Sequence, residues 1–137
     1  MGFVIRPYAS GDHTAVVAIW EACRLVVPQN DPAMDIQTKM KFQPDLFLVA
    51  LLEDRVVGTV MAGYEGHRGW INYLAVAPER RRQGIGRALM GAAEAALRNL
   101  GCPKINLQVR RTNRDVIAFY QAMGFREDDV LSLGKRL

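Results

Sequence analysis

Residues 74–89, from Leu74 to Leu89, have the sequence LAVAPERRRQGIGRAL. An apolar segment stops at Pro78, a basic loop with two glycines follows, and a helical pattern begins at Gly84. Backbone N–H groups at the start of a helix, at the positive end of its dipole, bind anions. Gly84 and Gly86 carry no side chain that would hold a phosphate away from those groups. The stretch therefore predicts a strand, an anion-binding loop and a helix, in that order.

Four arginines add positive charge to this loop, at Arg80, Arg81, Arg82 and Arg87. Two simpler explanations stay open, because glycines before a helix can form an ordinary turn and an arginine run is usually a solvated surface. Two other phosphate-binding motifs do not fit. The third glycine of the dinucleotide fingerprint would fall at Leu89, and the Gly-Lys-Ser/Thr of the P-loop is missing.

The hydrophobic pattern outside this stretch predicts alternating strands and helices. We expect strands at 4–6, 46–52, 56–64, 70–76, 105–109 and 130–137, and helices at 11–24, 31–42, 84–99 and 115–123. Asp31 and Pro32 suit the N-cap and the first position of the second helix. Tight turns join the three middle strands, so we predict an α/β (α+β) fold. Its sheet is mixed and mostly antiparallel, with helices on both faces. No linker or repeat is evident, so residues 1–137 are expected to form a single domain.

Composition narrows the class of protein further. The chain has 137 residues, half of them apolar, and a net charge of +4, which suits an anionic ligand or nucleic acid. It lacks the interleaved aromatics of a nucleic-acid surface, and its two cysteines and two histidines lack metal-ligand spacing. The longest apolar run, 46–52, is too short for a membrane span, and no signal-peptide pattern is present. We therefore expect a soluble, cytoplasmic protein that binds neither metal, nucleic acid nor membrane.

The pattern Arg81-x-x-Gly84-x-Gly86, placed after this strand, resembles the acetyl-CoA motif of the GNAT superfamily of N-acetyltransferases. Downstream, Asn113 and the run from Tyr120 to Phe125 resemble the second motif of that family. The resemblance covers essentially the whole chain. It is most similar to the small bacterial YpeA-like acetyltransferases, through segments 30–32, 34–36, 63–64, 66–69, 101–105 and 129–137.

The resemblance implies a site for acetyl-CoA where the strands around Leu74 and Leu107 splay apart. Backbone groups of Leu74 and Val76 would pair with the pantetheine arm, and the glycine loop would hold the pyrophosphate. The implied cofactor-binding residues are Leu74, Ala75, Val76, Arg81, Arg82, Gln83, Gly84, Ile85, Gly86, Arg87, Asn113 and Tyr120.

The implied reaction is acetyl transfer to a primary amine by direct attack in a ternary complex, with Tyr120 as the general acid. A phenol with a pKa near roughly 10 lies about 1.5 units above a thiol near 8.5, so proton donation is feasible. The alternative is that Tyr120 is an ordinary aromatic on an amphipathic helix. Some relatives that act on protein N-termini have Glu where Gln108 stands, which leaves the base unassigned among Glu65, His67, Glu79 and a bound water.

The acceptor pocket is expected between the first two helices and the Tyr64 loop. Its proposed lining consists of Trp20, Asn30, Asp31, Asp35, Tyr64, Glu65 and Tyr73. Structural roles compete for three of these, namely Trp20 in the core, Asp31 as a helix cap and Tyr73 in sheet packing. A catalytically silent acyl-CoA-binding module remains the main alternative function. The acceptor amine is not specified, and a homodimer formed through sheet edges is an option that the family often uses.

Overall fold

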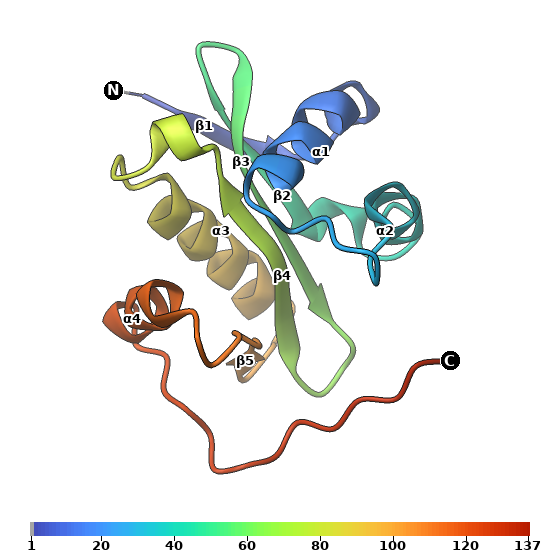
Figure 1. Ribbon diagram of the computed structural model, residues 1–137, viewed down its shortest axis with the longest axis vertical. Helices are drawn as coiled ribbons and strands as arrows, with labels where there is room; N and C mark the ends of the chain where they lie inside the picture. Colours follow the sequence, from blue (N-terminus) through green and yellow to red (C-terminus); the bar gives the residue numbers. More distant parts are fainter. Residues whose placement is uncertain (1) are drawn as a thin grey trace. The chain divides into compact units, whose positions relative to one another are not determined.

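The computed structural model describes residues 2–137, which group into two compact units, Met1–Leu107 and Gln108–Leu137. The first unit holds a five-stranded sheet and three α-helices (Figure 1). Its strands are β1 (Val4–Pro7), β2 (Phe47–Leu52), β3 (Arg55–Tyr64), β4 (Gly69–Val76) and β5 (Ile105–Asn106). Its helices are α1 (His13–Ala22), α2 (Pro32–Lys39) and α3 (Ile85–Asn99), with short 3-10 turns at Ser10–Asp12, Pro44–Leu46 and Pro78–Arg80.

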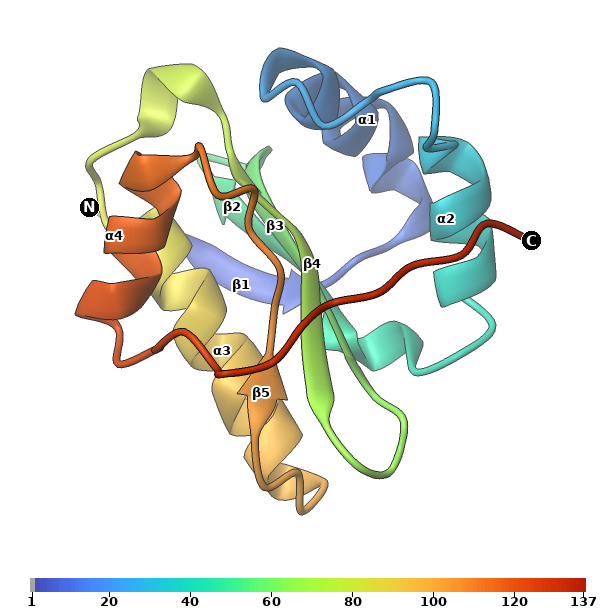
Figure 2. The same cartoon turned by 60° about the horizontal axis from the view of Figure 1, so that its bottom comes forward.

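The strands lie in the sheet in chain order, from β1 to β5 (Figure 2). The first three pairings are antiparallel, and only β4 and β5, joined through α3, run parallel. This arrangement confirms the predicted mixed, mostly antiparallel sheet.

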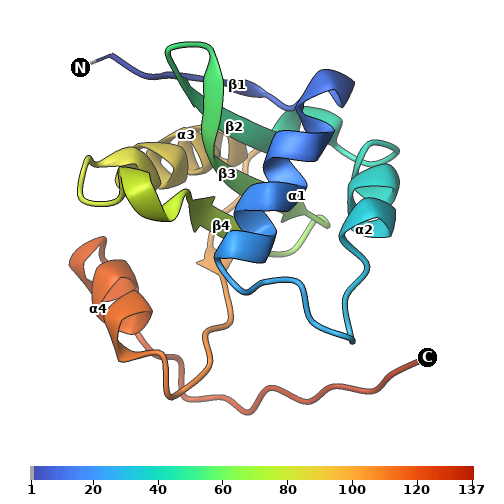
Figure 3. The same ribbon diagram turned by 45° about the horizontal axis from the view of Figure 1, so that its top comes forward.

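Helices cover both faces of this sheet, as two neighbouring residues of β3 show. A Cβ on Gly58 would lie 2.9 Å from Leu89 Cδ1, so this position faces α3. The hydroxyl of Thr59 accepts a hydrogen bond from Trp20 Nε1, so the next position faces α1. Because successive strand residues point to opposite faces, α1 and α3 lie on opposite sides of the sheet (Figure 3).

The core on the α1 side is built from stacked aromatic rings. Tyr8 stacks on Phe47 with ring centroids 4.6 Å apart, and Trp20 lies 6.1 Å from the same Phe47 ring. Val16, Ile19 and Trp20 of α1 are all buried, which confirms the helical spacing expected from the sequence.

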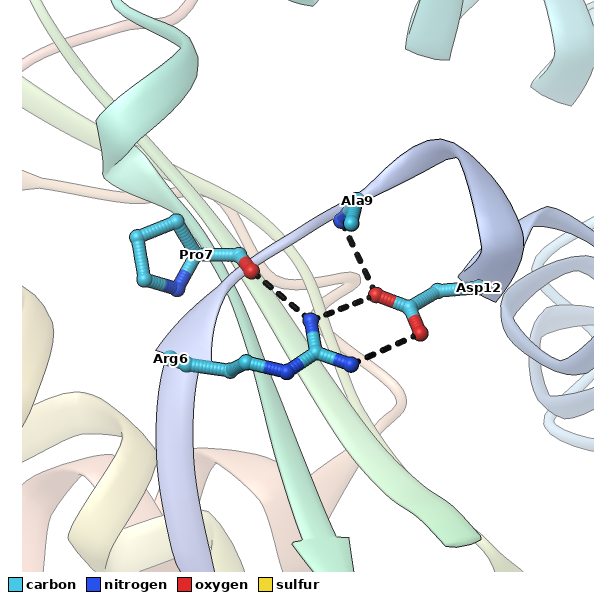
Figure 4. A network of polar contacts seen from close by, with 4 residues as sticks. All are labelled: Arg6, Pro7, Ala9 and Asp12. Carbon is cyan, nitrogen blue, oxygen red and sulfur yellow. Dashed lines mark hydrogen bonds and ion pairs between the residues drawn. The ribbon is translucent and has the colours of Figure 1, made fainter. Parts of the chain in front are cut away.

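A bidentate ion pair between Arg6 and Asp12 stabilises the connection from β1 to α1 (Figure 4). Arg6 donates to both oxygens of the Asp12 carboxylate, at 2.8 and 3.0 Å. The same carboxylate accepts from the Ala9 N–H at 2.9 Å. These contacts, with the hydrogen bond to Arg6 foremost, lower the pKa of Asp12.

Local signals located the helix ends well. The Asp31 carboxylate accepts from Met34 N at 3.1 Å, and Pro32 occupies the first turn of α2, as predicted. This helix ends at Lys39, earlier than expected, because the chain turns and Gln43 adopts a left-handed conformation with φ 52°. Gly84 is the N-cap of α3.

The second unit, Gln108–Leu137, contains α4 (Arg114–Ala122), which ends just before Gly124 at φ 96°. The strand predicted at 130–137 is wrong, because this segment has no regular structure and its leucines are exposed, Leu131 by 88%. Residues 108–137 contain no strand that could pair with it. The strand predicted at 105–109 is also shorter, because its pairing with β4 stops at Asn106. Within residues 2–137, no helix has the length and apolar character that a membrane span requires.

Candidate active site

A β-bulge interrupts β4 close to its end. The register of β3 against β4 shifts between Thr59 and Met61, so Tyr73 and Leu74 lie opposite the single residue Val60. Tyr73 has a φ of 52°, a left-handed conformation that is costly for a non-glycine residue. The bulge turns the backbone at Leu74, the first residue that the sequence assigned to the cofactor.

Two buried side chains hold this bulge in place. The Thr59 hydroxyl donates to the Tyr73 carbonyl oxygen at 2.7 Å and accepts from Trp20 Nε1 at 2.9 Å. Both Thr59 and Trp20 are completely buried. The Trp20 ring also stacks on Tyr73, with centroids 3.8 Å apart and planes 12° from parallel. Helix α1 therefore supports the strained backbone through β3.

One edge of β4 lacks a strand partner beside this bulge. β5 pairs with β4 only at Gly69 and Trp70, and within the described part of the unit Met1–Leu107 no other strand continues that pairing. The backbone from Ile71 to Val76 thus offers N–H and C=O groups at a sheet edge. An extended ligand with amide groups can pair with such an edge as an added strand would.

The glycine loop continues directly from this edge into α3. Gly84, the N-cap, has φ 79° and ψ 10°, and no side chain caps the first turn of the helix. That turn contains no acidic residue, and a Cβ at Gly84 would meet nothing within 4 Å. The open space and the uncapped N–H groups are features that an anion site requires, and the predicted anion site stays a prediction.

The arginines around this loop keep their charge available. Arg81, Arg82 and Arg87 are exposed and Arg80 is half-buried. Among residues 2–137, no carboxylate lies within 4.0 Å of any of these four guanidinium groups. They therefore supply cationic donors next to the uncapped helix start, which suits a polyanion such as a pyrophosphate.

A pocket of about 560 Å³ opens on the α2 side of the sheet. Its lining residues are Leu25, Asn30, Asp35, Thr38, Lys39, Phe42, Met61, Asn72 and Tyr73. The Tyr73 hydroxyl donates to Asp35 Oδ2 at 2.5 Å. Burial, together with the hydrogen bond to Asp35, raises the pKa of Tyr73. The pocket therefore reaches the residue that begins the bulge.

Lys39 is the buried cation of this pocket, with only 9% of its surface exposed. Its Nζ donates to the Ala62 carbonyl oxygen at 2.5 Å and lies 5.6 Å from the centre of the Phe42 ring. Burial lowers the pKa of Lys39, and the more distant Asp45 carboxylate opposes this effect. A mostly buried lysine thus forms part of the pocket wall.

The second unit contains the two residues of the second predicted motif. Tyr120, on α4, is 8% exposed, and its ring meets those of Phe119 and Phe125 edge-on at 5.2 and 5.4 Å. Burial raises the pKa of Tyr120 to about 12. Asn113 is the N-cap of α4, but its side chain makes no capping hydrogen bond and is exposed. The Asn113 amide is therefore not used to start the helix.

Comparison with known proteins identifies the family. The family model described as "Acetyltransferase (GNAT) family" matches residues 14–125. A curated acetyltransferase of Pectobacterium atrosepticum is 47% identical over 133 residues, which cover 97% of this chain and 94% of that protein.

The chain belongs to the GNAT acetyltransferase family.

Solved structures of GNAT-like proteins share its fold. Ard1 from Thermoplasma volcanium is 27% identical with a TM-score of 0.84, over 92% of this chain and 84% of that one. The PaiA N-acetyltransferase of Thermoplasma acidophilum, solved in complex with coenzyme A, is 19% identical with a TM-score of 0.74, over 95% of this chain and 93% of that one. The narrower YpeA-like assignment stays a prediction.

The seven predicted acceptor residues divide into three groups within this GNAT fold. Asn30, Asp35 and Tyr73 line the pocket beside α2. Trp20 lies in the core, where it supports the bulge, and Asp31 caps α2. Both of these are the structural roles that competed in the sequence analysis.

The other two predicted acceptor residues, Tyr64 and Glu65, lie at the end of β3 and in the turn that follows it. Gln43 holds Tyr64 by accepting from its N–H at 2.9 Å and donating to its carbonyl oxygen at 3.0 Å. Glu65 accepts from the N–H groups of His67 and Arg68, both at 2.6 Å, and these two bonds lower its pKa. A carboxylate with a lowered pKa is a weaker base, so this turn uses Glu65 mainly to hold its own backbone.

Sequence reasoning missed two polar residues of the site, Thr59 and Lys39. A threonine inside the apolar run of β3 was a usable signal, because a buried hydroxyl needs a partner. Lys39 gave no such signal, since a lysine near a helix end is ordinarily solvated.

Proposed function

We propose that this GNAT protein transfers the acetyl group of acetyl-CoA to a primary amine. The observation that carries the proposal is the free edge of β4, with its bulge, leading directly into an uncapped and arginine-rich helix start. An amide-bearing arm and a pyrophosphate, joined in one molecule, match those two features in order. That the PaiA relative was solved with coenzyme A supports the same ligand.

The cofactor contacts follow from this match. The backbone of Leu74, Ala75 and Val76 would pair with the pantetheine arm, and N–H groups from Arg81 to Gly86 would hold the pyrophosphate. Arg82 and Arg87 would neutralise its charge. From the family motif we place Asn113 and Tyr120 on the same ligand.

The reaction forms an N–C bond between the amine and the acetyl carbonyl carbon and breaks the C–S bond of the thioester. One proton leaves the amine nitrogen, and the thiolate takes up one proton. We assign the donor of that second proton as Tyr120. With the pKa of Tyr120 at about 12, donation to a thiolate whose thiol has a pKa near 8.5 is uphill by about 3.5 units, or about 5 kcal/mol. Tyr120 therefore donates only as negative charge develops on the sulfur.

At neutral pH the amine is an ammonium ion, so it must lose one proton before it attacks, in addition to the proton that it releases as the amide forms. A lysine-like amine of pKa about 10.4 is almost fully charged at pH 7, at a cost of roughly 4.6 kcal/mol to neutralise. Because the turn uses Glu65, a bound water is the simpler route for this proton.

We further propose a cytoplasmic enzyme in which residues 1–137 act as one domain, since the family match spans both compact units.

The cofactor site is tested by calorimetric titration of acetyl-CoA into the native protein, Gly84→Asp and Gly84→Asn. Both variants place a side chain of the same size at φ 79°, a conformation that aspartate and asparagine tolerate better than most residues. They differ only in charge. We expect the native protein to bind acetyl-CoA one-to-one. Gly84→Asp should weaken this binding at least about tenfold more than Gly84→Asn does. Absence of binding by the native protein would overturn the proposal.

The acid role of Tyr120 is tested by steady-state kinetics of Tyr120→Phe, with Tyr8→Phe as a second buried tyrosine outside the site. General acid catalysis predicts a loss in kcat of about 10²-fold or more for Tyr120→Phe only. Full turnover by Tyr120→Phe would remove Tyr120 from the mechanism. Binding of acetyl-CoA without turnover on any amine would instead favour the acyl-CoA-binding module.

A further inference from the structure

The pocket beside α2 carries one charge of each sign. Asp35 and Lys39 lie four residues apart on the same helix, and both line the pocket. An aspartate and a lysine at this spacing usually pair on a helix surface. Here no ion pair joins them, because Asp35 accepts from the Tyr73 hydroxyl and Lys39 donates to the Ala62 carbonyl oxygen. The two charges are thus held apart, facing the same space.

The Lys39 ammonium has one hydrogen-bond acceptor among residues 2–137. It has three N–H donors, of which one is used by Ala62, and no carboxylate of residues 2–137 lies within 4.0 Å of it. Burial of a charge is costly unless the charge is paired and hydrogen-bonded. The lowered pKa of Lys39 reflects that cost. An anionic group of a ligand in the pocket would pair with this charge and accept from its remaining N–H donors.

Part of the pocket lies beside the proposed cofactor site. Tyr73, which binds Asp35, immediately precedes Leu74, the first residue whose backbone the proposed function pairs with the pantetheine arm. A ligand amine beside Asp35 would therefore lie next to the proposed cofactor arm. Leu25, Phe42 and Met61 add apolar surface to the same pocket.

Resting on that proposed function, we propose that the acceptor is a small zwitterion, an amine that also carries a carboxylate, as amino acids do. Lys39 binds the carboxylate, and the Asp35–Tyr73 pair receives the amine. Lys39 is thus a specificity-determining residue. It selects which amine enters, while the acetyl transfer itself proceeds as described above.

The test compares kcat/KM for glycine, β-alanine and leucine with that for their decarboxylated counterparts methylamine, ethylamine and isopentylamine. The proteins are the native chain, Lys39→Met, Lys39→Gln and the control Lys41→Met, whose exposed lysine carries the same charge outside the pocket. Comparing ratios between proteins cancels the intrinsic pKa difference within each amine pair. Titration with acetyl-CoA confirms that each variant keeps its cofactor site.

We expect the native protein and Lys41→Met to prefer at least one aminocarboxylate by about tenfold or more, the size of a charge-assisted hydrogen bond. In Lys39→Met the preference falls toward unity, and Lys39→Gln, which can still donate to Ala62, behaves likewise. If Lys39 only links α2 to β3, the Lys39 variants should lower kcat/KM equally for the aminocarboxylates and for the plain amines. The ratio of the two kcat/KM values then stays unchanged, and the proposal fails. It also fails if the native protein binds acetyl-CoA but shows no preference for the carboxylate. Loss of acetyl-CoA binding by the native protein would instead refute the proposed function.

Discussion

Replacing Thr59 with valine removes one hydroxyl group and nearly preserves the shape of the side chain. That hydroxyl accepts from Trp20 Nε1 at 2.9 Å and donates to the Tyr73 carbonyl oxygen at 2.7 Å. Both Thr59 and Trp20 are completely buried. Valine therefore leaves the indole N–H without an acceptor where water does not reach it, and it releases the strained backbone of the bulge.

The expected loss of stability follows from these two bonds. A buried donor left without a partner costs about 1–3 kcal/mol, and the lost bond to Tyr73 about 1 kcal/mol more. The free energy of unfolding should therefore fall by about 2–4 kcal/mol. With an m-value of about 2 kcal/mol/M, the urea midpoint should fall by about 1–2 M.

Urea unfolding followed by circular dichroism measures this loss, with Thr14→Val, an exposed threonine of α1, as the control. Trp20→Phe provides the second arm of a double-mutant cycle, because phenylalanine keeps an aromatic ring but has no N–H. In that background Thr59→Val should cost about 1–3 kcal/mol less than it does alone. A cost below about 0.5 kcal/mol for Thr59→Val, or a cycle that is simply additive, would refute the reasoning.

Three further predictions concern the core and the titrating groups. Arg6 lowers the pKa of Asp12, so the pair stabilises the fold above the unfolded pKa of that carboxyl, and this contribution is lost as pH falls through the folded pKa. In thermal melts from pH 7 to 2, the midpoint of Asp12→Asn should therefore fall less with decreasing pH than that of the native protein. Gly58→Ala should lower the free energy of unfolding by about 1–3 kcal/mol, since the new Cβ on β3 would lie 2.9 Å from Leu89 of α3. Gly91→Ala, within α3 itself, meets nothing within 4 Å and should raise it by about 0.5–1 kcal/mol. Equal thermal midpoints for the two variants would contradict this. The raised pKa of Tyr120 means that its stabilising contribution is present below pH 10 and lost as pH rises toward about 12, so ultraviolet titration of Tyr120→Phe should lack a phenol that ionises there.

The sequence predicted those features that depend on short-range pattern. Asp31 and Pro32 mark the start of α2 because capping and a fixed proline φ act within a few residues. Gly84 marks the start of α3 for a similar reason, since its positive φ is a local demand. The order of glycine loop and helix was predictable because the two are contiguous in the sequence.

Features that depend on a partner far along the chain were not predictable in the same way. The bulge at Tyr73 exists only relative to Val60, since it is defined by two residues facing one on another strand. Lys39 is buried because α2 packs against the end of β3, and nothing in its own helix indicates that contact. The segment 130–137 shows the reverse error, since apolar content there suggested a strand although no partner strand exists in its unit.

Gly58 and Thr59 face opposite sides of the sheet, and this limits where the chain tolerates an insertion or a deletion. A slip of one residue turns every following side chain of a strand to the other face of the sheet. A slip of β3 in one direction would point Thr59 at Leu89, where even a bare Cβ is too close, and a slip in the other direction would leave Trp20 facing Gly58. Single-residue insertions and deletions should therefore be accepted in the turns at 53–54 and 65–68 and rejected between 55 and 64. A scan of such variants by expression and solubility would map the strand as one uninterrupted intolerant block.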